Sequence, residues 1–472
     1  MYKRFEKVHF VGIGGVGMSG IAEVLHNLGY EVEGSDLKES ETTKRLAGMG
    51  ISIKIGHRAE NVKKSDVVVI SSAVKSDNPE VEAARKLSIP VIPRAEMLAE
   101  LARLKYGVLV AGAHGKTTTT SLVASLLGEG KLDPTVVIGG KLKGIGSNAK
   151  LGGGEFLVAE ADESDGSFLK LSPTIAVVTN IDREHMDYFK SIDEIKAAFL
   201  SFINKVPFYG LSILCGDNDY IKELMPKIQR RFITYGLGEG MDLTARDIRT
   251  EGLSSVFEAV LNGKSLGPFK VPLIGRHNVS NSLAAIAVAN ELKVSMDIIR
   301  EALRNFSGVQ RRFELKGTAN GINVVDDYGH HPAEIMATLK AAREARDAAL
   351  RAQDTAPGTQ AAGRGRIVVL FQPHRYTRTR DLLSEFIDAF TDADKVILMD
   401  IYPAGEKPLP GVNSSLLYRG IKDTGKDIDY IQNREEILDY LGAELKEGEM
   451  LLTLGAGDVW KIGEEFLRIK SQ

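Results

Sequence analysis

The chain has 472 residues, more than one hydrophobic core normally serves, so about two to four domains are expected. Hydrophobic residues make up 43% and charged residues 26%, and the net charge of −3 argues against nucleic acid or an anionic membrane surface as a partner. A single cysteine, no apolar run near the roughly 20 residues that cross a bilayer, and no signal-peptide pattern predict a cytoplasmic protein without internal disulfides.

Residues 1–104 alternate short apolar runs with helical patterns. Such alternation predicts a parallel, doubly wound α/β sheet, which is a Rossmann-like domain. The predicted strands are residues 8–12, 30–36, 51–56, 67–72 and 90–94, and the last predicted helix is residues 95–103.

The first strand runs into the turn GIGGVG, in which Gly12, Gly14 and Gly17 fit the pattern G-x-G-x-x-G. Glycines in such a turn permit a tight bend and a close approach of the backbone to a diphosphate, which the following helix N-terminus attracts. Asp36 ends the second strand, where an acidic side chain can accept a hydrogen bond from a ribose hydroxyl. The alternative is a glycine turn without a ligand, and the pattern does not settle which nucleotide binds.

Residues 105–312 form a second predicted α/β domain. Its predicted strands are residues 106–112, 156–162, 174–180, 211–217 and 230–236. Residues 242–272 carry turn signals at hairpin spacing, which predicts a small antiparallel patch, and residues 275–292 are predicted to be helical.

The turn after the first of these strands is a shortened P-loop that begins at Gly112 and ends with Gly115, Lys116 and Thr117. Its amides are expected to surround phosphate groups, Lys116 to reach the β- and γ-phosphate oxygens, and Thr117 to ligate Mg²⁺. The turn therefore predicts an ATP site. A glycine turn with a surface lysine is the alternative, but it does not explain the threonine run at residues 117–120.

Polar residues follow two strands of this domain. Because ligands of open parallel sheets bind at the carboxyl ends of the strands, these residues are candidates for holding Mg²⁺. The candidates are Glu160, Asp162, Glu163 and Asp165 after one strand, and Asn180, Asp182, His185 and Asp187 after the other. Each of them alone is also compatible with an ordinary solvated loop.

Residues 306–317 indicate a second boundary, and residues 313–472 form a third predicted domain, again Rossmann-like. Its strands are predicted at residues 365–372, 395–400 and 450–457 and at the start of the stretch 322–335. Residues 353–366 are rich in Gly, Ala, Pro and Thr and predict a mobile surface loop. The boundary pair Arg311-Arg312 is a candidate hinge that could also hold phosphate, with an ordinary linker as the alternative.

Two polar stretches follow strands of the third domain. DDYGHHP contains Asp326, Asp327, His330 and His331, and FQPHRYTRTRD contains His374, Arg375, Tyr376, Arg378 and Arg380. The arginines predict a socket for a carboxylate or phosphate, with a solvated basic turn as the alternative. A metal site built from the histidines and aspartates is a weaker hypothesis, because adjacent histidines point in different directions.

Taken together, these motifs resemble the Mur ligase family, the ATP-dependent ligases of peptidoglycan precursor synthesis. The resemblance runs in order through GIGGVGMSGIA, RAEMLAEL, GAHGKTTTT, VAEADESDGSFL, TNIDREHMD, GRHNVSN, DDYGHHP and FQPHRYTRTRDL, and it covers essentially the whole chain. The first glycine loop, RAEMLAE and FQPHRYTRTRDL point to the member that adds L-alanine. The resemblance implies that residues 1–104 bind the UDP substrate, 105–312 bind ATP, and 313–472 place the amino acid and close over the ATP domain.

The resemblance also implies the site residues. UDP-N-acetylmuramate would contact Gly12, Gly14, Gly15, Gly17, Asp36, Ser71, Ser72 and Arg94. ATP would contact Gly112, Ala113, His114, Gly115, Lys116, Thr117, Thr118, Asn278, Asn281, Arg312, Asp326 and Asp327. Mg²⁺, or Mn²⁺ in its place, would be held by Thr117, Glu160 and His185. The amino acid and the muramoyl group would be placed by His330, Arg375, Tyr376 and Arg378, and the catalytic residues would be Lys116, His185 and His330.

In the implied reaction, ATP phosphorylates the muramoyl carboxylate, the amine of L-alanine attacks the acyl phosphate, and a tetrahedral intermediate collapses to the amide, ADP and phosphate. A recycling ligase that joins a tripeptide to the same nucleotide sugar is the alternative. An NAD-dependent oxidoreductase and a non-catalytic nucleotide-binding regulator are alternatives from other classes. The implied partners are small molecules, and the chain is expected to be a monomer or a homodimer.

Two positions depart from the family pattern. Ala113 stands where threonine is more usual, so one hydroxyl near the phosphates is missing. Leu200 stands near the point where sister ligases carry a carbamylated lysine, which leaves the ligands of a second metal open.

Overall fold

The structure is a computed structural model that describes residues 6–71, 73–140, 148–186, 188–354 and 365–470. Ser72, Asp187 and most of the predicted loop at residues 353–366 lie outside the described residues. The chain divides into two compact units. The first unit comprises Met1–Arg246, Phe257–Phe269 and Ser280–Val309, and the second comprises Asp247–Val256, Lys270–Val279 and Gln310–Gln472. Within the described residues, no helix is both long and apolar enough to cross a membrane.

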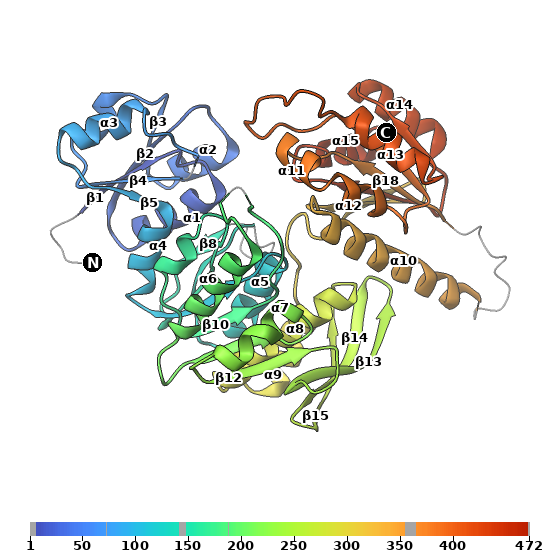
Figure 1. Cartoon of the computed structure of the whole chain (residues 1–472), viewed down its shortest axis with the longest axis horizontal. Helices are drawn as coiled ribbons and strands as arrows, with labels where there is room; N and C mark the ends of the chain where they lie inside the picture. The colour runs from blue at the N-terminus through green and yellow to red at the C-terminus, as the bar shows by residue number, and fades with distance from the viewer. Residues whose placement is uncertain (1–5, 72, 141–147, 187, 355–364, 471–472) are drawn as a thin grey trace. The chain divides into compact units, whose positions relative to one another are not determined.

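The first sheet has five parallel strands in the order β3-β2-β1-β4-β5, which confirms the predicted Rossmann-like domain (Figure 1). Its strands are β1 (Lys7–Val11), β2 (Glu31–Asp36), β3 (Ser52–Ile55), β4 (Val67–Ile70) and β5 (Val91–Pro93). Its helices are α1 (Val16–Asn27), α2 (Glu41–Gly48), the 3₁₀ turn η1 (Ala59–Val62), α3 (Pro79–Lys86) and α4 (Arg94–Ala102). The strand order reverses beside β1, so the turn after β1 lies where such sheets bind ligands.

Local sequence signals explain where two of these helices begin. At the start of α2, the Ser40 side chain accepts from the Thr43 amide while the Thr43 hydroxyl accepts from the Ser40 amide, which is a capping box. At the start of α3, the Asn78 side chain accepts from the Glu80 amide, and Pro79 takes the first helical position, where its missing amide hydrogen costs nothing. Both helix starts lie close to the ligand-binding edge of the sheet.

The second sheet has ten strands in the order β15-β14-β13-β12-β11-β10-β6-β9-β7-β8. Its strands are β6 (Tyr106–Ala111), β7 (Thr135–Val137), β8 (Ala149–Lys150), β9 (Phe156–Glu160), β10 (Ile175–Val178), β11 (Leu211–Cys215), β12 (Phe232–Gly236), β13 (Leu243–Glu251), β14 (Ser254–Leu261) and β15 (Lys264–Val271). Its helical elements are α5 (Lys116–Glu129), η2 (Ser167–Lys170), α6 (Ile192–Asn204), α7 (Asp219–Leu224), η3 (Met225–Lys227), α8 (Arg276–Glu291) and α9 (Met296–Arg304).

Strand β6, which carries the second glycine turn, lies between β9 and β10 and is parallel to both. The two polar strand ends that the sequence singled out therefore flank this turn. At the far end of the sheet, β13, β14 and β15 are neighbours joined by the short connections 252–253 and 262–263, which is the antiparallel patch that was predicted (Figure 1).

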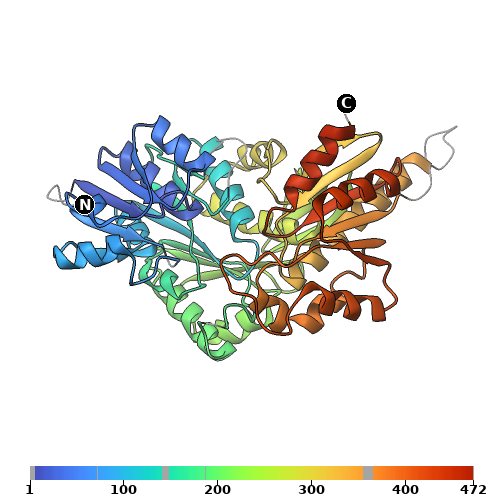
Figure 2. The same ribbon diagram turned by 90° about the horizontal axis from the view of Figure 1, so that it is seen from above.

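The third sheet has six strands in the order β16-β17-β21-β18-β19-β20, drawn from gold to red in Figures 1 and 2. Its strands are β16 (Glu314–Ala319), β17 (Ile322–Asp327), β18 (Ile367–Phe371), β19 (Lys395–Leu398), β20 (Ile428–Tyr430) and β21 (Met450–Leu454), and only β16 is antiparallel to its neighbour. Its helices are α10 (Pro332–Asp354), α11 (Tyr376–Asp381), α12 (Leu383–Asp388), α13 (Ser414–Asp423), α14 (Arg434–Glu444) and α15 (Trp460–Lys470).

Both faces of this third sheet are buried. Along β18, Val369 and Phe371 belong to one apolar cluster, whereas Val368 and Leu370 belong to another. Alternate residues of a strand point to opposite faces, so a strand covered on both sides becomes a continuous apolar run. The parallel sheet with both faces covered confirms the Rossmann-like fold predicted for the third domain. Strand β16 begins inside the stretch 306–317 that the sequence indicated only as a boundary.

Candidate active site

The turn after β1 is held by the end of β2. Gly12 has φ of +77°, which favours glycine, and the amides of Gly12 and Ile13 donate to the Ser35 carbonyl oxygen at 2.8 and 3.0 Å. The Gly14 amide donates to Asp36 Oδ2 at 2.8 Å. A Cβ at Gly14 would lie 2.8 Å from the same oxygen. Asp36 therefore anchors the turn, and its contact with a ribose stays a prediction.

A pocket of about 650 Å³ opens at this turn. Five of the predicted nucleotide-binding residues line it, namely Gly12, Gly14, Gly15, Asp36 and Ser71. The sequence analysis missed His57 and Asn78, which line it as well. The pocket lies at the edge of the sheet where a Rossmann-like domain binds a nucleotide.

Gly17 and Arg94 lie against each other next to this turn. A Cβ at Gly17 would lie 2.8 Å from Arg94 Nη1. The missing side chain at Gly17 therefore leaves space for the Arg94 side chain, and not for close packing of the helix on the sheet. Arg94 Nη2 also lies 3.4 Å from Asp162 Oδ2 in the central domain of the same unit. This pairing places a cation at the start of α1, where the helix N-terminus also favours an anion.

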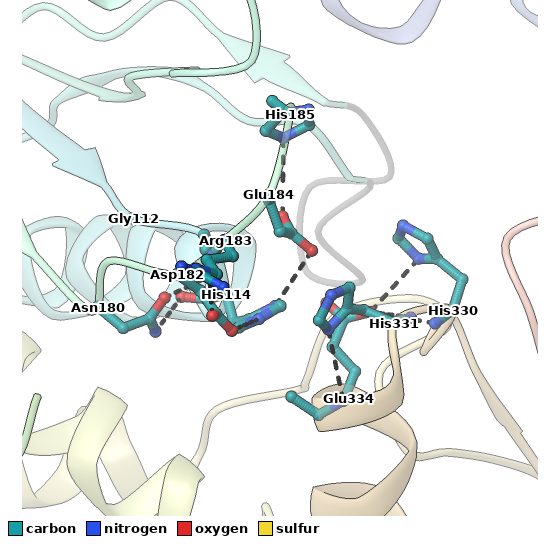
Figure 3. Close-up of polar contacts among 12 residues, drawn as sticks. Gly112, His114, Asn180, Asp182, Arg183, Glu184, His185, His330, His331 and Glu334 are labelled. Carbon is teal, nitrogen blue, oxygen red and sulfur yellow. Dashed lines mark hydrogen bonds and ion pairs between the residues drawn. The ribbon is translucent and has the colours of Figure 1, made fainter. Parts of the chain in front are cut away.

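The second glycine turn is locked to the end of β10. Gly112 has φ of +138°, and a Cβ there would overlap Thr179 Oγ1 and lie 3.0 Å from the backbone N and O of Asn180. Thr179 Oγ1 and Asn180 Nδ2 donate to the His114 carbonyl oxygen at 2.6 and 3.0 Å. The His114 amide donates to Asn180 Oδ1 at 2.8 Å (Figure 3). The backbone of this turn is therefore preorganised.

Lys116 opens α5, and its ammonium group is bound on several sides. Lys116 Nζ lies 2.8 and 3.0 Å from the carboxylate oxygens of Glu163, and it donates to the carbonyl oxygens of Gly112 and Ala113 at 2.5 and 3.2 Å. Burial lowers the pKa of Lys116, but the attraction of Glu163 and Asp162 outweighs burial and raises this pKa above its ordinary value. Burial also raises the pKa of Glu163 to about 7, against the opposing effect of Lys116. Lys116 is thus a permanent cation beside the turn.

A group of potential cation ligands lies beside Lys116. His185 Nε2 is 3.6 Å from Glu184 Oε2 (Figure 3) and 3.9 Å from Glu163 Oε1. Ligand atoms of the three side chains lie within 4.8 Å of one another. His185 has φ of +56°, which is uncommon for a residue with a side chain. Carboxylate oxygens suit Mg²⁺ or Mn²⁺, and an imidazole is acceptable to Mn²⁺, so this group fits a divalent cation.

The predicted metal ligands Glu160 and Thr117 contact the turn at residues 138–140 instead of the group around His185. Glu160 Oε1 accepts from the Gly139 amide at 2.7 Å, and a Cβ at the next residue, Gly140, would lie 3.0 Å from Thr117 Cγ2. The 138–140 turn thus contacts both side chains. Glu160 and Thr117 stay predicted ligands. Glu184 was not among the predicted ligands, although an acidic residue directly before His185 was a signal that the sequence offered.

Two helices place further predicted ATP residues. Asn281 on α8 accepts from Thr119 Oγ1 at 3.2 Å, and a Cβ at Gly115 would lie 2.8 Å from Asn281 Oδ1. Asn278, one turn earlier on α8, donates to the Ile274 carbonyl oxygen at 2.8 Å. Asn281 therefore touches the glycine turn directly. The Thr118 side chain is buried inside α5, so only its backbone is suited to a phosphate.

In the second unit, the predicted aspartates are internal anchors. Asp326 is fully buried, pairs with Arg311 Nε at 3.0 Å and accepts from Thr453 Oγ1 at 2.7 Å. Asp327 accepts from the amides of Phe313 and Gly329 at 2.7 and 2.8 Å. Burial raises the pKa of both carboxyl groups, that of Asp327 to about 6. These contacts favour a structural role, and direct binding of ATP by either residue stays a prediction.

The two boundary arginines differ in their surroundings. Arg311 has φ of +60°, and its guanidinium group also donates to the carbonyl oxygens of Gly455 and Gly457 at 2.5 and 3.2 Å. Arg312 makes weaker contacts, 3.9 Å from Glu334 Oε1 and 5.4 Å from the centre of the Tyr328 ring. Arg312 thus makes the weaker contacts of the two, and its binding of ATP stays a prediction.

His330 is held as a neutral imidazole. Its Nδ1 lies 3.0 Å from the Tyr328 carbonyl oxygen, and its amide donates to Glu334 Oε2 at 3.1 Å (Figure 3). Because a carbonyl oxygen can only accept, Nδ1 carries the proton and Nε2 presents a lone pair. Burial lowers the pKa of His330 to about 3. Such a ring is a hydrogen-bond acceptor and a weak base.

The basic stretch at the start of α11 is built around a strained residue. Arg375 has φ of +73° and ψ of 139°, and its amide donates to the Tyr402 carbonyl oxygen at 2.9 Å. Arg378 Nη1 lies 3.4 Å from His374 Nδ1, and the His374 ring stacks on Tyr402 with centroids 5.6 Å apart. Burial lowers the pKa of His374 to about 4.

The rings of His374 and His330 have centroids 5.7 Å apart, so the two predicted stretches of the third domain meet. Tyr376, another predicted residue, is the first residue of α11 beside them. Arg380 pairs instead with its neighbour Asp381 at 2.6 Å on the exposed side. Arg378 therefore lies beside His374, whereas Arg380 pairs elsewhere, and the socket with Arg375 stays a prediction.

Comparison with known proteins places these sites in a family. Family models match residues 7–106 (Mur ligase family, catalytic domain), residues 110–289 (Mur ligase middle domain) and residues 311–457 (Mur ligase, glutamate ligase domain). The UDP-N-acetylmuramate–L-alanine ligase of Desulfatibacillum aliphaticivorans is 57% identical over 472 residues, covering 100% of both chains. The enzyme of the same name from Geobacter sulfurreducens is 55% identical and covers 99% of this chain and 98% of its own.

Solved structures of related ligases have the same fold as this chain. The crystal structure of a UDP-N-acetylmuramate–alanine ligase from Thermotoga maritima superposes with a TM-score of 0.82 at 30% identity, covering 98% of this chain and 99% of that one. A murein peptide ligase from Psychrobacter arcticus has a TM-score of 0.69 at 22% identity over 98% of each chain, which speaks for the fold alone.

Proposed function

The chain belongs to the Mur ligase family, and we propose that it joins L-alanine to the carboxylate of UDP-N-acetylmuramate while ATP is cleaved to ADP and phosphate. The observation that carries the proposal is the pair of glycine turns in the first unit. One opens onto a pocket of about 650 Å³, and the other carries Lys116 between two acidic strand ends. Two separate nucleotide sites are what a ligase with a nucleotide-linked acceptor requires.

The first step is transfer of the γ-phosphoryl group of ATP to the muramoyl carboxylate. A carboxylate is a poor acylating agent until one oxygen becomes a good leaving group, and phosphorylation supplies that. Lys116, a permanent cation at the turn, stabilises the charge on the transferring group. A divalent cation at Glu163, Glu184 and His185 would neutralise further phosphate charge when bound.

The second step is attack of the L-alanine amine on the acyl phosphate. We infer that His330 accepts a hydrogen bond from this amine through Nε2 and orients its lone pair, because a ring with a pKa of about 3 holds a proton poorly at neutral pH. Arg375 and Arg378 supply the positive charge that would hold a carboxylate. This disfavours His330 as the proton acceptor, and His185 could accept the proton only through a ring nitrogen that is not bound to the cation.

The test measures phosphate release with ATP, Mg²⁺ and UDP-N-acetylmuramate, with and without L-alanine, and with the tripeptide as a parallel acceptor. L-Alanine-dependent release, with the nucleotide sugar gaining one alanine by mass, is the expected result. Release only with the tripeptide would assign the recycling ligase, and ATP binding without release in either case would favour a regulator. Nicotinamide fluorescence on titration with NADH would reveal an oxidoreductase. The cytoplasmic location and the oligomeric state stay predictions.

A further inference from the structure

His9 on β1 is a fully buried histidine that lies between two carboxylates. Its Nδ1 is 3.5 Å from Glu33 Oε1 on β2, and its Nε2 is 3.5 Å from Glu80 Oε2 on α3. On the other neighbouring strand, β4, the apolar Val68 stands opposite His9. A neutral imidazole has one N–H and one lone pair, so one carboxylate would then face a lone pair. Only the protonated ring presents an N–H to both carboxylates.

Both carboxylates are ionised in the interior of the domain. Burial alone would raise the pKa of each, but His9 and further partners lower it to about 2. Lys7 Nζ lies 3.3 Å from Glu33 Oε2 and is shared with the exposed Glu31 at 2.8 Å. Without a proton on His9, the buried side chains would therefore hold an excess of negative charge, which is costly. Burial lowers the pKa of His9, but the two carboxylates outweigh burial and raise it.

Glu80 connects His9 to the walls of the nucleotide pocket. Ser35 Oγ donates to Glu80 Oε2 at 2.5 Å, and His57 Nδ1 lies 3.3 Å from the same oxygen. Ser35 is also the residue whose carbonyl oxygen holds the first glycine turn. At the start of α3, the Glu80 amide donates to Asn78 Oδ1 at 2.9 Å. Since His57 and Asn78 line the pocket, Glu80 supports two of its walls as well as the turn.

We propose that His9 is a positioning residue of the nucleotide pocket, a buried cation that holds the Glu80 carboxylate in place and thereby fixes the pocket walls. His9 is fully buried, so it acts through Glu80 and not by contact with the substrate. The inference rests on the proposed function, because it assumes that UDP-N-acetylmuramate occupies this pocket.

The raised pKa of His9 gives this role a defined pH dependence. The folded pKa lies above the value of about 6.5 of an unfolded histidine. The stabilisation is therefore complete below about pH 6.5 and is lost as the pH rises through the folded pKa. Affinity for the nucleotide substrate is expected to fall over the same interval, because deprotonated His9 no longer holds Glu80.

The first test uses the full-length wild-type protein. Nuclear magnetic resonance with isotope-labelled histidine follows the titration of the nine histidine rings, and the His9 signal is identified by its loss in His9→Gln. His9 is expected to titrate above about pH 6.5, and calorimetric affinity for UDP-N-acetylmuramate is expected to fall where His9 titrates. Titration of His9 below about pH 6.5, or an affinity that stays constant where His9 titrates, would overturn the proposal.

Charge-balanced variants separate this role from simple packing. His9→Gln removes the cation, so below about pH 6.5 it should lower the melting temperature and weaken UDP-N-acetylmuramate binding about 10-fold. The double variant His9→Gln with Glu80→Gln removes one charge of each sign and leaves Glu33 with Lys7. It should recover much of the affinity and lose the pH dependence. Equal losses of affinity in the single and double variants would contradict the proposal.

His26→Gln is the matched control in the same domain. His26 is a half-buried residue of α1 whose Nε2 lies 3.0 Å from the Met49 carbonyl oxygen. This variant should keep the affinity and the pH dependence of the wild type, so any titration of the ligand itself appears in both. A loss in His26→Gln equal to that in His9→Gln would assign the effect to histidine removal in general and overturn the proposal.

Correct folding of each variant is checked by its unchanged affinity for ATP at the separate P-loop. The two proposals fail in different ways. A wild type that binds UDP-N-acetylmuramate through His9 but releases no phosphate with L-alanine would contradict the ligase activity alone. A wild type that releases phosphate but binds the nucleotide sugar independently of His9 would contradict the positioning role alone.

Discussion

Replacement of Gly112 by alanine is expected to distort the ATP turn and destabilise the central domain. The new Cβ would overlap Thr179 Oγ1 and approach the Asn180 backbone to 3.0 Å, and φ at this residue is +138°. Backbone strain of this kind costs about 1–3 kcal/mol. If Thr179 rotates away, its hydrogen bond to the His114 carbonyl oxygen is lost, at about 1 kcal/mol. The sum is about 2–4 kcal/mol.

Scanning calorimetry with and without ATP and Mg²⁺ measures this change. For a domain of about 200 residues, 1 kcal/mol shifts the melting temperature by about 2–4 °C, so the transition should fall by about 4–16 °C. The stabilisation by ATP should disappear, and L-alanine-dependent phosphate release should drop by about 10²-fold or more, as for loss of preorganised charge stabilisation.

Gly128→Ala in α5 is the matched control. No atom lies within 4 Å of the position its Cβ would take, and the residue is helical. Alanine should stabilise the helix by about 0.5–1 kcal/mol and leave turnover unchanged. A Gly112→Ala protein that melts and turns over like the wild type would refute the steric reasoning.

Three further predictions concern charged and titrating groups. Lys116→Met should lower kcat by about 10²–10³-fold without changing calorimetric binding of UDP-N-acetylmuramate; an unchanged kcat would remove Lys116 from phosphoryl transfer. Because the pKa of His330 is about 3, below the about 6.5 of an unfolded histidine, the unfolded chain takes up the proton first, and stability should fall as pH drops from about 6.5. His330→Gln should flatten this fall in melting temperature and raise KM for L-alanine more than it lowers kcat. Loss of the acidic limb of the pH profile of kcat in this variant would instead mark His330 as a base. Arg375→Ala should lower kcat/KM by about 10²-fold, as expected for a charged hydrogen bond worth about 3 kcal/mol, while Arg380→Ala, whose guanidinium pairs with Asp381, should stay within about twofold; equal losses would place both in the socket.

The sequence alone predicted the three α/β domains, both glycine turns and the antiparallel patch. These features depend on residues close together in the chain, such as the strand, turn and helix around Gly112 or the two-residue connections of β13–β15. Four strands were missed: β16 begins inside the stretch 306–317 that resembled a linker, and β7, β8 and β20 are only two or three residues long. Strands β7, β8 and β20 have too few residues for a periodic pattern to stand out.

Only the tertiary structure decided which residues far apart in the sequence contact each other. Strand order brings Glu163 to Lys116 across 47 positions and places Glu80 beside Ser35 across 45. The fold also made Asp326 an anchor for Arg311 and His330 a neutral acceptor. Local sequence can specify a turn or a cap because the interacting groups are neighbours. The charge of a carboxyl or imidazole group depends on solvent exposure and on through-space partners, which exist only once the sheets are assembled.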